Sequence, residues 1–523
     1  MVKKNYRLSR KNNITKRLYK ERLYKGGTAI HSAADSAANT IKSFIKSKIK
    51  TLGKKSIKSK EDKSKNIIGR FMKNTSQKRR SEFLKVICSD SGVCMAFGTN
   101  RKKILKFFDN FTDFKYVVSP IRKIGQVSEN GFVKEIKYEK NGYVSFAVLK
   151  SSAAKDADNL VYEYIVGQFI NKLAHIYPCF LQTYGLYYYK TETYWKQSRD
   201  TANISSETMK ASIEPENQIY NYGKMCENSK HAAILIEHVK DAKSLGDLIK
   251  SKNQGIFHSF LLYHLAYVLY QVYMPLSQLK SIFTHYDLHL DNILIYEPVK
   301  GKYIEYNYHL DNGDIVKFKS PYIVKIIDYG RCYYKYDTEV NNPNPLTIYR
   351  KVCFEAKCRI RNKDFSIKSR CGRDMGFGWL DPYLNKDDFF ISSSMNNQSH
   401  DLRLLNEINI KCKLDNGTSR IELSHFTPDE QQSILALINM IKKVKYGFGI
   451  SESKYKNYGT KPNETSGLPS KINNVEDAEK ALREIILTNQ FMKVINDSYY
   501  DIDDKLGDMH IYSDNRPMRF EPV

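Results

Sequence analysis

Alternation of apolar and polar residues dominates the stretch from about residue 112 to residue 151. Three runs carry it, "KYVVSPIRKIG" (115–125), "GFVKEIKYE" (131–139) and "YVSFAVLKS" (143–151), and they are broken at "QVSEN" and "KNG". A period of two between turn residues is typical of β-strands that bury one face. The pattern therefore predicts three consecutive strands.

Helical periodicity follows the third predicted strand. "DADNLVYEYIVGQFINKLAHIYP" (156–178) repeats apolar residues every three or four positions, which predicts a helix. Two more strands are predicted at "FLQTYGLYYY" (180–189) and "AAILIEHV" (232–239). The polar stretch between them, at about 190–230, has the composition of a surface insertion.

The second half of the chain is mainly helical in its pattern. A strongly apolar helix is predicted at "GIFHSFLLYHLAYVLYQVYM" (255–274), followed by a polar loop, the strand "NILIYE", a Tyr-rich hairpin and "PYIVKIIDYGRCYY". Further helices are predicted at "SHDLRLLNEI", "DEQQSILALINMIKKV" and "VEDAEKALREIIL". The order predicts an α+β fold with two lobes, a small β-rich one containing one helix and a larger helical one.

Charge separates an N-terminal arm from the rest of this 523-residue chain. Residues 1–90 hold 26 Lys and Arg against 6 Asp and Glu, which is +20 of the formal charge of +27. We expect this arm to be largely disordered, except for "NTIKSFIKSKIKTL" (39–52), which has the pattern of a basic amphipathic helix. The helix would suit an anionic membrane surface, a partner groove or docking on the protein itself, and the arm as a whole would suit a polyanion.

Cysteine and apolar content restrict the class of protein. The nine cysteines form no CxxC pair, which argues against a zinc ribbon or a disulfide framework. No apolar run reaches the roughly 20 residues of a membrane span, and the basic N-terminus lacks the apolar segment of a signal peptide. We therefore expect a soluble, intracellular protein with reduced thiols.

The loop "THYDLHLDN" (284–292) concentrates the candidate chemistry. His285 and His289 are four residues apart, a spacing that suits zinc only on a continuous helix, whereas the alternating leucines here are unlike a helix face. The alternative is that Asp287 and Asn292, five residues apart, are a carboxylate and an amide serving phosphoryl transfer. On that interpretation His285 is a packed loop histidine and His289 lies near the phosphates.

Two residues upstream and one downstream support the second interpretation. Lys150 ends the strand "FAVLK", and Glu163 follows it by 13 residues in an apolar helix, where an unpaired carboxylate would be costly to bury. An ion pair between the two explains both positions. Asp328 follows the apolar strand "IVKII" and precedes Tyr329-Gly330. Phosphoryl transfer needs such a set, with a cation for the phosphates and oxygen ligands for Mg²⁺.

These segments together resemble the eukaryotic-type protein kinase family. "HYDLHLDN" is similar to H-R-D-L-x-x-x-N, "DYG" to D-F-G and "FAVLK" to V-A-I-K. The resemblance implies binding of ATP and Mg²⁺. It makes Asp287 the catalytic base, Asn292 and Asp328 the metal ligands, and Lys150 the contact to the α- and β-phosphates with Glu163 as its partner.

The resemblance also implies a nucleotide pocket. "IGQVSENGFV" occupies the place of the glycine-rich loop, with Ser128 where a middle glycine would stand. "ILIEHVKDAKSLGDLI" resembles the hinge that binds adenine, and "SHDLRLL" suggests that Asp401 braces the catalytic loop. The residues implied to bind nucleotide, besides Lys150, are Gly125, Ser128, Gly131, Val133, Ala147, Glu237 and Val239.

Departures from the family pattern leave the acceptor open. Tyr286 replaces the Arg of the loop, His289 replaces the Lys two residues after the base, as in aminoglycoside kinases, and no A-P-E follows. The motifs, with their Tyr-, Lys- and Asn-rich composition, resemble those of the divergent serine/threonine kinases of large DNA viruses. This resemblance implies a location in the host cytoplasm or virion. We expect a kinase acting on Ser/Thr of proteins; the alternatives are a small-molecule kinase and a pseudokinase or scaffold.

The expected division of the chain follows from these assignments. It comprises the arm (1–90), a first lobe with hinge (112–240), a second lobe (241–500) and a C-terminal tail (501–523). The sequence does not specify an oligomeric state.

Overall fold

The computed structural model describes residues 97–128, 131–152, 160–216, 231–335, 396–414, 421–444 and 471–523, with the backbone of four short strands between residues 359 and 391. Contacts divide the chain into two units, Met1–Ser81 and Glu82–Val523, and every described residue belongs to the second. The predicted basic arm, including the helix expected at 39–52, therefore lies outside the described residues.

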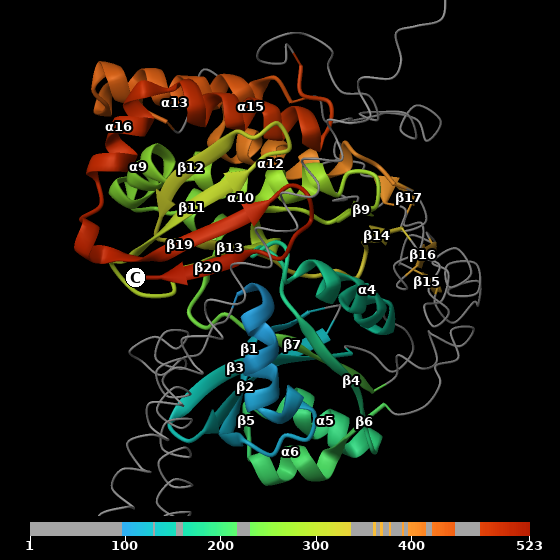
Figure 1. Ribbon diagram of the computed structural model, residues 1–523. Helices are drawn as coiled ribbons and strands as arrows, with labels where there is room; N and C mark the ends of the chain where they lie inside the picture. The colour runs from blue at the N-terminus through green and yellow to red at the C-terminus, as the bar shows by residue number, and fades with distance from the viewer. Residues whose placement is uncertain are drawn as a thin grey trace, which may run out of the picture. The chain divides into compact units, whose positions relative to one another are not determined.

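An antiparallel sheet of seven strands forms the first part of the described chain (Figure 1). Its order is β5-β1-β2-β3-β7-β4-β6. The strands are β1 (Val117–Ser128), β2 (Gly131–Lys140), β3 (Tyr143–Ser151), β4 (Thr183–Tyr189), β5 (Asn203–Ile204), β6 (Ile213–Pro215) and β7 (Ala232–Glu237). Asn141 and Gly142, both with positive φ, make the two-residue turn between β2 and β3, as expected for Asn-Gly in a hairpin. All five strands predicted from periodicity in this region are present.

One face of the sheet is covered by the segment that precedes it. This segment comprises η1 (Gly98–Asn100), α3 (Arg101–Phe107) and η2 (Asp109–Phe111). Phe107, Phe108 and Phe111 are buried in a cluster with Ile136 and Leu149 of the sheet. Since Phe burial stabilises a fold by about 1.5–3 kcal/mol per side chain, this part of the fold begins before residue 112, where the sequence placed its start.

The stretch expected to be a surface insertion is partly built into the sheet. It contains α5 (Glu192–Asp200) and α6 (Ser206–Ser212), while β5 and β6 extend opposite edges of the sheet. Trp195 and Met209 are buried in the same cluster as the phenylalanines. The burial of Trp195 and Met209 was not predicted, because the residues around them are mostly polar. Residues 217–230 lie outside the described part.

Helix α4 (Leu160–Leu173) packs against β4 and β7. Its apolar face is buried, and so is Glu163 in its first turn, at 2% exposure. Helix α4 approaches β4 closely at Gly167. A Cβ atom added to Gly167 would lie only 2.2 Å from Oγ1 of Thr183, so a larger residue would not fit there. The predicted helix is therefore present, and close packing holds it against the sheet.

The second part of the described chain is mainly helical. Its helices are α8 (Leu245–Ile249), α9 (Gln254–Tyr263), α10 (Leu265–Gln278), α12 (Arg403–Cys412), α13 (Pro428–Lys442), α15 (Val475–Thr488) and α16 (Gln490–Ser498), with short η6 (His400–Leu402) and η7 (Leu423–His425). Residues 265–277 of α10 are all buried, and α10 contacts α9 and α15. The helix predicted at 255–274 is thus two helices, which break at His264 (φ −130°). The imidazole of His264 packs edge-on against Tyr322, 5.0 Å between ring centres.

A four-stranded sheet joins the predicted Tyr-rich hairpin to the end of the chain. The hairpin is β11 (Tyr303–His309) and β12 (Ile315–Ser320). After η8 (Ile502–Asp504), β19 (Lys505–Tyr512) pairs in parallel with β11, and β20 (Arg519–Pro522) follows. The segment expected to be a tail is therefore part of a sheet (Figure 1). Phe520 of β20 contacts Phe97, with 5.2 Å between ring centres.

The remaining described elements are short. They are β8 (Lys243–Ser244), β9 (Phe283–Thr284), η4 (Leu290–Asn292), β10 (Ile293–Tyr296), β13 (Ile323–Ile326), β14 (Tyr333–Tyr334), β15 (Arg359–Arg361), β16 (Ile367–Ser369), β17 (Gly376–Phe377) and β18 (Phe390–Ile391). The described chain has an α+β fold, as predicted. Within it, no helix combines the length and the apolar character that crossing a membrane requires.

Candidate active site

The loop between β9 and β10 is held in place by one buried carboxylate. Asp401 of η6 accepts the backbone N–H groups of His285, at 2.8 Å, and Tyr286, at 3.0 Å. Burial raises the pKa of Asp401 to about 7, and these two hydrogen bonds oppose the rise. Tyr286 adopts a positive φ of 61°, a conformation that is costly for an aromatic residue and is kept only when its surroundings fix it. Asp401 therefore braces the loop, as the sequence suggested.

His285 connects the loop to the segment between β13 and Asp328. Its Nε2 atom lies 3.0 Å from the carbonyl oxygen of Ile327, and its Nδ1 atom accepts the Asp287 N–H at 3.3 Å. These partners assign the proton to Nε2. Burial lowers the pKa of His285 to about 4, so its imidazole is neutral at pH 7. The residue is a packed loop histidine, and residues 285–289 are not helical, so they do not place two histidines on one helix face.

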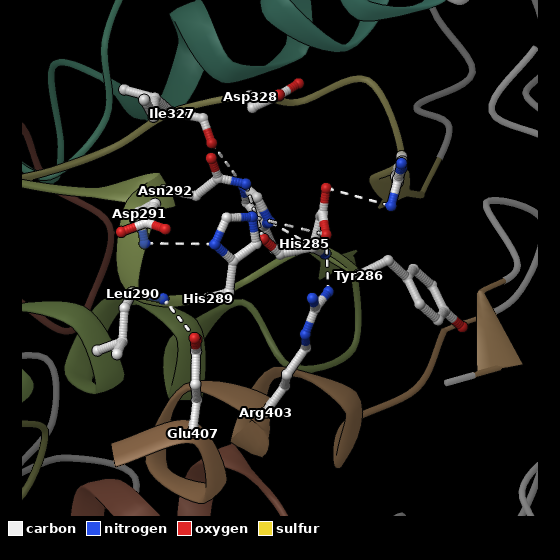
Figure 2. A network of polar contacts seen from close by, with 12 residues as sticks. His285, Tyr286, His289, Leu290, Asp291, Asn292, Ile327, Asp328, Arg403 and Glu407 are labelled. Carbon is white, nitrogen blue, oxygen red and sulfur yellow. Dashed lines mark hydrogen bonds and ion pairs between the residues drawn. The ribbon is translucent and has the colours of Figure 1, made fainter. Parts of the chain in front are cut away.

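Asn292 is fixed from both sides. The side-chain Nδ2 atom of Asn292 donates to the backbone carbonyl oxygen of Asp287 at 2.9 Å. The backbone carbonyl oxygen of Asn292 accepts the Ile327 N–H at 3.1 Å. Figure 2 shows Asn292 beside His285, with Ile327 and Asp328 on the neighbouring segment that follows β13. The predicted metal ligands Asn292 and Asp328 are thus brought to adjacent segments.

Lys150 forms the centre of an ion-pair network. Its Nζ atom lies 2.7 Å from Oε2 of Glu163 and 3.0 Å from Oδ1 of Asp328. Burial alone would lower the pKa of Lys150, but the attraction of Asp328 and Glu163 raises it above its usual value. Burial likewise opposes the ionised form of Asp328, yet Lys150 lowers the pKa of Asp328 to about 2. The predicted Lys150–Glu163 pair is present, and Asp328 is added to it.

The two carboxylates that contact Lys150, Glu163 and Asp328, differ in their pKa and in their exposure to solvent. Burial raises the pKa of Glu163 to about 7, because the Lys150 ammonium only partly offsets the loss of water. Asp328 remains 34% exposed at its side chain and has a positive φ of 67°. A strained backbone at a charged residue is common at functional sites. Asp328 is therefore the carboxylate of the network that stays ionised and accessible.

Asp287 lies between two arginines that the sequence reasoning missed. Nη1 of Arg403 is 2.7 Å from Oδ1, and Nη1 of Arg331 is 3.3 Å from Oδ2. Burial acts to raise the pKa of Asp287, but the two guanidinium groups lower it overall. Nε2 of His289 is 3.9 Å from Oδ1 of Asp287, and burial lowers the pKa of His289 below its usual value.

The predicted glycine-rich loop is the hairpin between β1 and β2. Gly125 has a positive φ of 66°, and a Cβ atom added there would have no neighbouring atom within 4 Å. Ser128 pairs with Gly131 across the hairpin. Residues 129 and 130 at its tip lie outside the described part. Val133 pairs with Lys150 in the sheet, so these two residues share a face.

Ala147 requires a correction. Side chains alternate along a strand, so Val148, and not Ala147, shares the face of Lys150. Ala147 packs with Leu149 and Ile136 in the cluster on the other face, whereas Val148 contacts the core cluster that includes α4. The period of two in "FAVLK" contained this information, but the assignment of Ala147 was taken from the resemblance instead.

The hinge residues are anchored by the segment before the sheet. Glu237 forms an ion pair with Arg101 and accepts the Gln182 N–H at 3.0 Å. Arg101 also donates to the carbonyls of Ala174, at 2.6 Å, and Phe180, at 3.3 Å. Val239 is buried at 2% exposure. The backbone at Glu237 and Val239 is therefore held firmly, although an arginine in a basic stretch offered no sequence signal for this role.

Comparison with known proteins assigns no family, since no protein-family model matches the chain and a search of curated proteins finds no match. The function of the chain is therefore inferred from the geometry of these residues.

Proposed function

We propose that this protein is an ATP- and Mg²⁺-dependent kinase that phosphorylates Ser or Thr hydroxyls of proteins. The observation that carries the proposal is the position of Lys150, whose ammonium contacts both Glu163 and Asp328. These residues are separated by up to 178 positions in the chain. Asp287 is linked to the same place because His285 contacts Ile327, the residue before Asp328.

Each member of the set has a role in phosphoryl transfer. Lys150 would contact the α- and β-phosphates, with Glu163 holding its ammonium in position. The backbone at Glu237 and Val239 would bind adenine, and the hairpin containing Gly125, Ser128 and Gly131 would cover the phosphates. Asp287 would accept a hydrogen bond from the acceptor hydroxyl. Such positioning and charge compensation account for most of the catalysis in this reaction class.

Asn292 and Asp328 fit a magnesium site. Mg²⁺ is usually held by one or two carboxylates together with substrate phosphates and water. Asp328 is ionised, and Asn292 uses its NH₂ group on the Asp287 carbonyl, which directs its amide oxygen elsewhere. Among the described residues no group of three or more His, Cys, Asp and Glu could hold a metal by itself, so the phosphates would complete the site. The ion would neutralise charge on the β- and γ-phosphates.

The proposed step is an in-line displacement. A bond forms between the acceptor oxygen and the γ-phosphorus while the bond from that phosphorus to the β,γ-bridging oxygen breaks. The hydroxyl proton passes to Asp287, and ADP leaves with the electron pair of the broken bond. Because the arginines lower the pKa of Asp287, it is a weak base, and its main contribution is orientation of the hydroxyl.

The proposal includes a two-lobed kinase architecture, with the seven-stranded sheet and α4 as one lobe and the helical part as the other. It also includes a place among the intracellular kinases of the large-DNA-virus type. The support for this is the order of strands, helix, hinge and catalytic loop along the chain, together with the motif similarity.

Transfer of radiolabelled phosphate from ATP to generic protein substrates tests the proposal. Asp287→Asn should abolish most of the transfer, and Asp328→Asn should remove the Mg²⁺-dependent stabilisation by ATP in thermal unfolding. Asp291→Asn is the matched control, since Asp291 lies in the same loop but is exposed and pairs with Lys250 at 3.2 Å. Equal transfer by wild type and Asp287→Asn would overturn the proposal.

A small-molecule kinase is the second candidate, and the observation that favours it is His289 beside Asp287 in place of a lysine. Screening aminoglycosides, choline and sugars in the same assay separates it from a protein kinase. A wild-type protein that binds ATP·Mg²⁺ but transfers phosphate to none of these acceptors would instead fit the pseudokinase or scaffold alternative.

A further inference from the structure

Two arginines contact the carboxylate of Asp287. Arg403 contacts one carboxylate oxygen at 2.7 Å and Arg331 the other at 3.3 Å. Both guanidinium groups therefore lie where the proposed acceptor hydroxyl would bind. A phosphoryl group in transfer spreads negative charge over three equatorial oxygens, so a cation at this point has an evident use.

Among the described residues, Lys150 and His289 are the other nearby side chains that could place a positive charge on the γ-phosphoryl group, and neither is suited to it. Lys150 holds Glu163 and Asp328, which places it at the α- and β-phosphates in the proposed function. His289 occupies the position two residues after Asp287, but burial lowers the pKa of His289 and so favours its neutral imidazole. An arginine, in contrast, carries a permanent positive charge.

Arg403 is held by a rigid element. It is the first residue of α12, and it lies between Asp401 and Glu407, which both anchor the loop. Asp401 accepts two loop N–H groups, and Oε2 of Glu407 accepts the Leu290 N–H at 2.9 Å. Figure 2 shows Arg403 and Glu407 extending from the same helix towards the loop. A donor fixed in this way needs little reorganisation during the reaction, which is the basis of electrostatic catalysis.

We propose that Arg403 is a catalytic residue that donates hydrogen bonds to the γ-phosphoryl group as it passes from ATP to the acceptor hydroxyl bound at Asp287. This inference rests on the proposed function. In the displacement described above, the guanidinium stays protonated and stabilises the charge on the equatorial oxygens. Arg331 follows Gly330 directly and adds a second donor on the far side of Asp287.

Steady-state kinetics with ATP, Mg²⁺ and a protein acceptor tests the inference. Arg403→Gln should lower kcat by about 10²- to 10³-fold, the usual loss for one charge-stabilising donor, while the KM for ATP changes by less than about threefold. Arg403→Lys should recover part of kcat. Arg483→Gln is the control, since Arg483 pairs with Glu479 at 3.5 Å on α15 and should leave both constants unchanged.

A double-substitution cycle separates contact with the phosphoryl group from mere support of Asp287. If Arg403 acts only by positioning Asp287, adding Arg403→Gln to Asp287→Asn will not reduce the residual rate further. We expect a further reduction of at least about tenfold. Added methylguanidine should partly rescue Arg403→Ala, and thermal unfolding with ATP·Mg²⁺ verifies that each variant is folded.

A kcat within about threefold of wild type for Arg403→Gln would overturn this inference alone. A wild-type protein without any transfer would overturn the proposed function instead.

Discussion

Nε2 of His285 lies 3.0 Å from the carbonyl oxygen of Ile327, which ties the loop of Asp287 to the segment that leads from β13 to Asp328. The bond requires a proton on Nε2, while Nδ1 accepts the Asp287 N–H. A protonated imidazole could not accept that N–H. The neutral form of one buried histidine therefore maintains the spacing between the two candidate catalytic carboxylates.

Acidification should destabilise the protein through His285. Burial lowers the pKa of His285 from 6.5 to about 4, so the unfolded chain binds the proton more readily, and stability present above pH 6.5 is lost as the pH falls towards 4. Between pH 7 and pH 5 the loss is about 2 kcal/mol. Thermal unfolding of His285→Gln should show a weaker pH dependence than wild type over this range.

The control for this prediction is His425→Gln, because His425 is more than half exposed at its side chain. It should retain the wild-type pH dependence. His264 and His400 also have pKa values lowered by burial, so the comparison of variant with wild type, and not the wild-type curve alone, isolates His285. An unchanged pH dependence in His285→Gln would contradict the prediction.

Removal of the Lys150 ammonium should impair both stability and nucleotide binding. Lys150→Met leaves Glu163, 2% exposed, without its cation, and breaking such a pair costs roughly 3 kcal/mol or more. Asp328 also loses the cation that lowers its pKa. Urea unfolding and titration with ATP·Mg²⁺ measure the two effects. Lys250→Met, which removes an exposed lysine paired with Asp291, should change neither.

Much of the local structure and part of the site could be predicted from the sequence, because both depend on short-range patterns. Period-two runs identified β1, β2 and β3, and the chemistry of a buried Glu163 identified its partner Lys150. The role of Arg403 was not predicted, because an arginine in the first turn of a helix has the same sequence pattern as an ordinary solvent-exposed arginine. Its partner Asp287 also lies 116 positions away in the chain. The contact of Phe97 with Phe520 depends on how the two ends of the described chain pack, which no local pattern encodes.

Arg101 should be essential for the stability of the hinge region. It is 3% exposed and holds Glu237 together with the carbonyls of Ala174 and Phe180. Arg101→Met would leave the Glu237 carboxylate largely buried without this partner, at a cost of about 3–5 kcal/mol. Chemical denaturation measures the loss. A control variant, Arg199→Met, removes the pair that the partly exposed Arg199 forms with the exposed Asp200 and should cost less than about 1 kcal/mol.

Gly507 should be required for the strand pairing that joins the end of the chain to the hairpin. It lies in β19 at φ +155°, and a Cβ atom there would stand 2.3 Å from the Glu521 carbonyl oxygen of β20. The clash is with backbone, so we expect Gly507→Ala to cost about 2 kcal/mol and to release β20 for proteolysis. Limited proteolysis and thermal unfolding measure this. Gly255→Ala in α9, where the nearest atom to an added Cβ is Oδ1 of Asn253 at 3.4 Å, should be neutral or slightly stabilising. Equal protease resistance of both variants would show that β20 does not depend on this close approach.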